Sequence, residues 1–143
     1  MRPSEYDDEY PACARTYASW RINSPDLDPE AVSKSLDIEG TTAHVSYPVS
    51  NTGVVRRSGM WILSTKDTVD SYDLRRHIDW LLDSIEPRKF ILTELVEAGA
   101  RSDISCYWQS RWGSGGPILS PAQMARLVRL NLSVWIDAYG PDD

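Results

Sequence analysis

Polar and apolar residues alternate along 14–23, the first regular stretch of the chain. A period of two is typical of a β-strand with one face in the core and the other facing outward. We therefore predict a half-buried strand there. The residues expected to face the core are Thr16, Ala18, Trp20 and Ile22, and those expected on the other face are Arg15, Tyr17, Ser19 and Arg21.

Four later stretches repeat the alternation and are predicted as further strands, at 42–49, 60–65, 104–112 and 132–139. A long loop joins the first two. The third stretch is expected to turn Ile104, Cys106, Trp108 and Trp112 to one side and Ser105, Tyr107, Gln109 and Arg111 to the other. The fourth is expected to turn Leu132, Val134 and Ile136 inward and Trp135, Asp137 and Tyr139 outward.

Capping residues and apolar stripes predict helices between these strands. The predicted helices run from Asp28 to about Leu36, from Asp70 or Ser71 to Glu86, from Pro87 to Gly99 and from Ser120 to about Asn131. The stripes expected to face the core contain Leu74, Ile78, Leu81, Leu82 and Ile85, then Phe90, Ile91, Leu92, Leu95 and Val96, then Leu127 and Val128.

The order of elements is β-α-β-β-α-β-α-β, which indicates an α+β fold. Its first six elements match the ferredoxin-like β-α-β-β-α-β core, and one helix and one strand are appended. We expect a mainly antiparallel sheet covered by helices on one face. The 143 residues suit a single domain, 1–143, whose ends at about 1–13 and 140–143 are expected to fray.

The charge balance narrows the classes of partner. The net charge is −6, so a general binder of nucleic-acid phosphates is not expected. No apolar run approaches the length of a membrane span, and the first residues do not form a signal peptide. Cys13 and Cys106 lack the spacing of a metal or redox site, so we expect buried thiols, no metal, no cofactor and a cytoplasmic location.

Seven short segments together resemble one family of bacterial proteins. They are 17–22 (YASWRI), 26–30 (DLDPE), 59–64 (GMWILS), 77–82 (HIDWLL), 104–108 (ISCYW), 115–117 (GGP) and 119–121 (LSP). In this ordered set the chain resembles the domain-of-unknown-function family 4279 from about 14 to 139. The resemblance supports the fold and implies no activity, because most of these positions are caps and core strands.

The outward face of the sheet is the first candidate site. Tyr, Trp and Arg dominate the energetics of protein interfaces, and the chain has six Trp and seven Tyr. The alternatives are that loops, the N-terminal tail or a second copy of the chain cover this face. The candidate binding residues are Tyr17, Arg21, Tyr107, Gln109, Arg111, Trp112, Trp135, Asp137 and Tyr139, with His44 on a further strand.

A glycine-rich segment is the second candidate. Backbone N–H groups of glycines ahead of a helix can bind an anion, and a neighbouring arginine would add charge. The segment lacks the lysine of a phosphate loop, so a plain wide turn is the competing interpretation. The candidate anion-binding residues are Arg111, Gly113, Ser114, Gly115 and Gly116.

Acid–base chemistry and a basic loop complete the candidates. His44 or His77 could act with Asp137 or Asp73, although His77 lies beside a buried stripe and a structural role is favoured. No nucleophile-base motif or metal-spaced cluster is present.

Arg56-Arg57 could contact an acidic partner or form a solvated loop tip.

The sequence therefore favours a non-catalytic protein-interaction module, of inhibitory or immunity-like type, that binds a protein partner or a second copy of itself. The alternative is an enzyme that binds a small molecule or anion at the loop 113–117.

Overall fold

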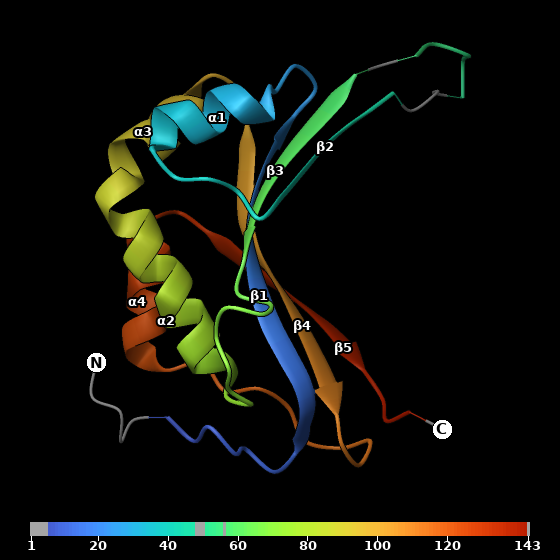
Figure 1. The fold of residues 1–143 in the computed structure, drawn as a ribbon, viewed down its shortest axis with the longest axis vertical. Helices are drawn as coiled ribbons and strands as arrows, with labels where there is room; N and C mark the ends of the chain where they lie inside the picture. Colours follow the sequence, from blue (N-terminus) through green and yellow to red (C-terminus); the bar gives the residue numbers. More distant parts are fainter. Residues whose placement is uncertain (1–5, 48–50, 56, 143) are drawn as a thin grey trace.

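One five-stranded sheet organises the computed structural model, which describes residues 6–47, 51–55 and 57–142 (Figure 1). The strand order is β2-β3-β1-β4-β5, and every neighbouring pair is antiparallel except β4 and β5. The strands are β1 (Cys13–Ser24), β2 (Thr42–Ser46), β3 (Ser58–Ser64), β4 (Arg101–Ser110) and β5 (Ser133–Tyr139).

The helices lie together on one side of this sheet (Figure 1). They are α1 (Pro29–Leu36), α2 (Leu74–Ile85), the 3₁₀ turn η2 (Glu86–Arg88), α3 (Lys89–Glu97) and α4 (Pro121–Arg129). The predicted α+β class, with a mainly antiparallel sheet and helices over one face, is confirmed. Among the residues described, no helix is long and apolar enough to cross a bilayer.

The connections explain the strand order. β3 lies between β1 and β2, so the unit β1-α1-β2 is split by an antiparallel strand. The helix α4 then carries the chain from β4 to β5, which forms a parallel edge strand whose position the sequence did not indicate. The finer ferredoxin-like assignment stays a prediction.

Local capping starts the helices. The Asp28 carboxylate accepts a hydrogen bond from the Glu30 backbone N–H at the start of α1. Ser120 and Gln123 form the predicted reciprocal capping box of α4. For α2 the predicted start at Asp70 or Ser71 was wrong, because the helix begins at Leu74 and the Asp73 carboxylate caps it by accepting from the Arg75 N–H.

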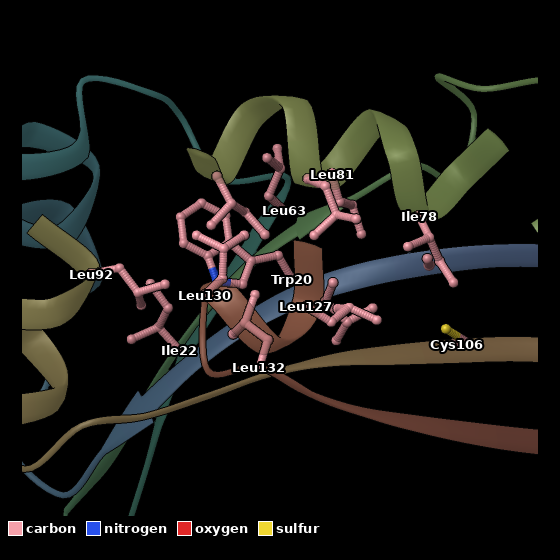
Figure 2. Close-up of a cluster of buried hydrophobic side chains, with 14 of the residues drawn as sticks. Trp20, Ile22, Leu63, Ile78, Leu81, Leu92, Cys106, Leu127, Leu130 and Leu132 are labelled. Carbon is pink, nitrogen blue, oxygen red and sulfur yellow. The ribbon is translucent and has the colours of Figure 1, made fainter. Parts of the chain in front are cut away.

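Large apolar side chains from both layers fill the space between helices and sheet (Figure 2). Trp20 of β1 and Trp61 of β3 meet edge to face, with ring centroids 5.0 Å apart. Each indole N–H donates to a serine hydroxyl, so neither polar group is buried without a partner. The core residues around them include Ile22, Leu63, Ile78, Leu81, Leu92, Cys106, Leu127, Leu130 and Leu132.

Three apolar residues of the predicted core stripes, Phe90, Val96 and Val128, lie at the surface. Phe90 of α3 is 73% exposed and Val128 of α4 is 78% exposed, because both helices are short and contact the core through few residues. Trp112 lies beyond the end of β4 and is also exposed. The strand stops at Ser110, whose hydroxyl accepts from the Gly113 N–H and donates to the Ser114 carbonyl, so a turn replaces the alternation.

The N-terminal segment 6–12 lies against α2. The Tyr6 hydroxyl donates to Asp79, the Asp7 N–H donates to Asp73, and Asp8 pairs with Arg76. Tyr10 packs against the core and donates to the Gly116 carbonyl. Residues 1–5 and 143 of the predicted tails, together with Val49 and Arg56, lie outside the residues that the structure describes.

Candidate functional site

A stack of three tyrosines crosses the sheet face that is opposite the helices, called here the open face. Tyr17 of β1 and Tyr107 of β4 are direct cross-strand partners, with ring centroids 5.0 Å apart and planes 5° from parallel. Tyr139 of β5 continues the stack at 5.0 Å from Tyr107. Rings held by neighbouring strands lose little conformational freedom on binding, so the stack is a preorganised contact surface.

Two cations lie over one end of this tyrosine stack. The Arg15 guanidinium is 5.6 Å from the centroid of the Tyr17 ring, and the Lys66 ammonium is also 5.6 Å from it. These separations fit cation–π contacts. Within the described residues neither cation forms an ion pair, so both charges are available to a partner.

A fixed ion pair occupies the next part of the open face. The Arg21 guanidinium donates to both carboxylate oxygens of Asp103, at 2.8 and 2.6 Å, and these hydrogen bonds raise the pKa of Arg21. The guanidinium carbon also lies 5.5 Å from the Trp135 ring, which is 57% exposed. The pair holds the arginine beside the most exposed aromatic ring of β5.

A row of small side chains separates these two groups. The strand register places Ser64, Ser19 and Ser105 side by side on β3, β1 and β4, and Trp135 follows on β5. The row lies one step of two residues, or roughly 6.7 Å, from the tyrosines and the same distance from Arg21. The open face therefore has hydroxyl groups between two lines of larger side chains.

The C-terminal residues cover one corner of the open face. Gln109 of β4 is buried because its side-chain amide donates to the Gly140 carbonyl and the Asp142 carboxylate. The Tyr139 hydroxyl donates to Asp137, and this hydrogen bond raises the pKa of Tyr139. Gln109 thus contributes to internal structure, while Tyr139 stays half exposed beside Asp137.

Several polar groups of the predicted anion loop bond within the protein. Gly113 and Gly115 have positive φ angles of 85° and 83°, which suits a wide turn. Arg111 donates to the backbone carbonyls of Pro11 and Cys13, and its guanidinium lies near the Tyr72 ring. Arg111 therefore holds the N-terminal segment and does not join the tyrosines of the open face.

The loop is also separated from the helix that follows it. Residues 117–119 lie between Gly116 and the capped start of α4 at Ser120. Gly115 packs against Ala12, where an added Cβ would lie 3.1 Å from the Ala12 Cβ. The segment is thus built as a turn against the N-terminal residues.

The structure separates the predicted acid–base residues. His44 lies on the open face at β2 and Asp137 at β5, on opposite edges of the sheet. His77 is buried between Thr65 and Ser71, while Asp73 caps α2 and binds Arg75 instead of the imidazole. Neither histidine is within hydrogen-bond reach of the carboxylate paired with it in the prediction.

Arg57 of the predicted basic loop makes a long contact, 3.4 Å from the Pro25 carbonyl. Arg56, the other residue of this pair, lies outside the residues that the structure describes.

Two hollows of the surface lie away from the open face. A cavity of about 440 Å³ between α1 and the start of β2 is lined by Glu30, Ser33, Glu39, Thr41 and Trp61, among others. Another of about 410 Å³ lies where Tyr6 and Arg76 meet Asp79. Across residues 6–47, 51–55 and 57–142, no three His, Cys, Asp or Glu side chains gather closely enough to hold a metal ion.

Three members of the open face were not among the predicted site residues. Arg15 was predicted to lie on the outward side of its strand but was not selected as a site residue. It shares that side with Tyr17, two residues along the strand, and this spacing was a sufficient signal. Lys66 and Asp103 lie just outside the predicted strands, and only the register brings them to Tyr17 and Arg21. Seven of the nine predicted binding residues lie on the open-face side of the sheet. Arg111 and Trp112 lie beyond the end of β4.

Comparison with known proteins identifies a family but no activity. No curated protein matches the chain, and no solved structure matches it. A family model described as a domain of unknown function, DUF4279, matches residues 14–141, which include all five strands from the second residue of β1 onward. The chain therefore belongs to the DUF4279 family.

Proposed function

We propose that this protein is a non-catalytic binding module that captures a protein partner on its open face, in the manner of an inhibitory or immunity-type protein. The observation that carries the proposal is the tyrosine stack with Arg15 and Lys66 over its end, two cations without ion-pair partners among the described residues. We place its action in the cytoplasm, where the buried thiols of Cys13 and Cys106 would stay reduced.

The composition of the open face supports binding. Aromatic and arginine side chains supply large contact areas at low entropic cost, and Trp135 and Tyr139 keep about half of their surface exposed. Arg21 is already oriented by Asp103, so a partner would meet a fixed donor group. A preformed surface of this kind needs little rearrangement on association.

The charges favour an acidic partner surface. The whole chain has a net charge of −6, yet the end of the tyrosine stack carries two cations. A local positive site attracts carboxylates, while the net negative charge of the rest of the molecule repels other acidic surfaces. We therefore propose that the partner presents Asp or Glu side chains, together with aromatic rings, to Arg15 and Lys66.

The enzyme alternative at the loop 113–117 draws less support. Arg111 and the Gly113 N–H, two of the groups that would hold an anion, already have protein partners. No other observation on the loop favours catalysis.

A defined acidic probe tests the proposal. A synthetic copolymer of glutamate and tyrosine should bind the wild-type protein in calorimetry, with an affinity that falls as salt is added. The double variant Arg15→Glu, Lys66→Glu should lose at least about tenfold in affinity, because two attractive charges become repulsive.

Phe90→Ala, which truncates an exposed aromatic residue on the helix side, is the matched control and should bind like the wild type. Equal binding by the charge-reversed variant, or loss of binding in the control, would rule out the open face as the site.

A further inference from the structure

The outer edge of β5 is a free strand edge without the usual protection. β5 pairs with β4 on one side only, in unbroken register from Ser133 to Tyr139. Edge strands commonly avoid pairing with other chains through lysine, proline, bulges or short length. β5 has seven residues with no lysine, no proline and no bulge, and its one charged side chain is Asp137.

Apolar side chains accompany this edge on the helix side of the sheet. Val134 and Ile136 point toward the helices but are only half buried, and Ala138 is exposed. The core therefore ends before it reaches the last strand. A further strand beside β5 would cover this incomplete part of the core.

The helix α4 extends the same apolar region. Arg126 faces α2, where it binds Asp79, Asp83 and Glu86. Met124 and Val128 are two residues before and after Arg126, so they project on the opposite side of α4, about 200° around its axis. Both residues are exposed on this side of α4, which is turned away from α2, and α4 leads into β5 along the chain.

We infer that the β5 edge strip, defined as Met124, Val128, Val134, Ile136 and Ala138, is the interface at which a second copy of this chain docks. Its five residues are apolar, and the charged residues next to them in sequence, Arg129 of α4 and Asp137 of β5, are not part of the strip. Two acidic molecules repel each other least where charge is absent, and interface cores are depleted in charge.

A second copy is also complementary in geometry. A two-fold axis through Ile136, the midpoint of β5, pairs all seven residues of one strand with those of its partner in antiparallel order. Trp135 then lies opposite Asp137, and Val134 lies opposite Ala138, so the register brings no like charges together. The other edge strand, β2, is five residues long and exposed on both faces, so it would bury less.

The mass in solution tests this inference. Two chains of 16.2 kDa should sediment as a dimer that dissociates on dilution. Val128→Glu changes a largely exposed position and should weaken dimerisation at least about tenfold, because a charge would be buried at the interface. Phe90→Glu introduces the same charge at a comparably exposed apolar position on α3 and should leave the dimer unchanged.

A wild type that stays monomeric up to about 0.1 mM would overturn the inference. So would equal weakening by Val128→Glu and Phe90→Glu, since a general charge effect would then explain the loss.

Cysteine pairing tests the register separately. Trp135→Cys and Asp137→Cys should form a disulfide-linked dimer when the two variants are mixed and oxidised, because positions 135 and 137 face each other across the axis. Each variant alone should form little, because its own cysteines are then separated along the strands. Equal cross-linking in all three samples would contradict the Ile136 register. The dimer does not depend on the acidic-partner proposal, so either can fail without the other.

Discussion

His77 is a buried imidazole whose two nitrogens both have partners. Its Nε2 lies 2.8 Å from the Ser71 carbonyl, and its Nδ1 lies 2.6 Å from the Thr65 hydroxyl. A carbonyl only accepts, so Nε2 carries the proton and Nδ1 accepts from Thr65. Burial lowers the pKa of His77 below the ordinary 6.5, and the neutral form holds the start of α2 against the end of β3.

Protonation of His77 should therefore destabilise the fold. The unfolded chain binds this proton more tightly than the folded chain does, so the free energy of unfolding should decrease as pH falls below about 6.5. Urea unfolding at a series of pH values measures the slope. His77→Gln should flatten the slope in this window, and His44→Gln, at an exposed position, is the control. An unchanged slope in His77→Gln would contradict the assignment.

Burial also governs the two thiols. Burial away from water raises the pKa of the Cys106 thiol to about 12, and it also raises the pKa of the Cys13 thiol. Both side chains lie in the core under the helices, so they act as small apolar residues. The sequence prediction of two buried thiols is confirmed for both.

At the scale of elements, Arg126 joins α4 to α2. Its guanidinium contacts Asp83 and Glu86 at the surface and the buried Asp79 beneath them. These acidic partners raise the pKa of Arg126 against the opposing effect of burial. Three carboxylates along α2 are thus held by one side chain of another helix.

Removing this cation should be costly. Arg126→Met should lower the free energy of unfolding by about 3 kcal/mol, because Asp79 would keep only its hydrogen bonds from Tyr6 and Gln123. Thermal or urea unfolding measures the loss. Arg129→Met, on the same helix but exposed, should change stability by less than about 0.5 kcal/mol. Similar losses in both variants would mean that the helix, and not the charge cluster, is the sensitive feature.

Gly59 controls how closely β3 approaches the turn before α1. A Cβ added there would overlap the backbone carbonyl oxygen of Leu27, which cannot move as a side-chain end could. Gly59→Ala should therefore destabilise the fold by about 2 kcal/mol or more. Gly116→Ala has open space and should be close to neutral. Unfolding curves compare the two, and a stable Gly59→Ala protein would show that β3 can shift.

Elements with local signals could be predicted, and those fixed by distant contacts could not. Asp28 and Ser120 cap their helices through bonds to residues two or three positions away, so α1 and α4 were located from sequence. Ser110 ends β4 through side-chain bonds that the alternation does not reveal, and Trp112 was misplaced for that reason. The Arg126 contacts span 40 to 47 positions and gave no sequence signal.

At the scale of the whole molecule, alternation was enough to find the open face. Tyr17, Tyr107 and Tyr139 were assigned to the same side by their strand positions, and the register confirms that they are neighbours. The cations required knowledge of which strands adjoin, because Lys66 follows β3 and contacts a ring of β1. The edge position of β5 could not be predicted from alternation either, because it depends on the strand order. This edge position leaves Trp135 exposed.

The two proposed surfaces meet at β5. Its outward residues belong to the open face, and its inward residues belong to the β5 edge strip. A dimer formed along this edge would place two open faces side by side in one continuous sheet, with both copies of Trp135 near the axis. Two partner sites would then lie on a single surface.

The central claim is that the open face is the working surface of this protein. The most direct measurement is an NMR titration of the wild-type protein with the glutamate–tyrosine copolymer, following aromatic side-chain signals. Signals of Tyr17, Tyr107, Tyr139 and the Trp135 indole should shift together as the copolymer is added, while those of Phe90 and the buried Trp61 should stay unchanged. Shifts confined to Phe90 and the helix side, with the tyrosine stack unaffected, would contradict the claim.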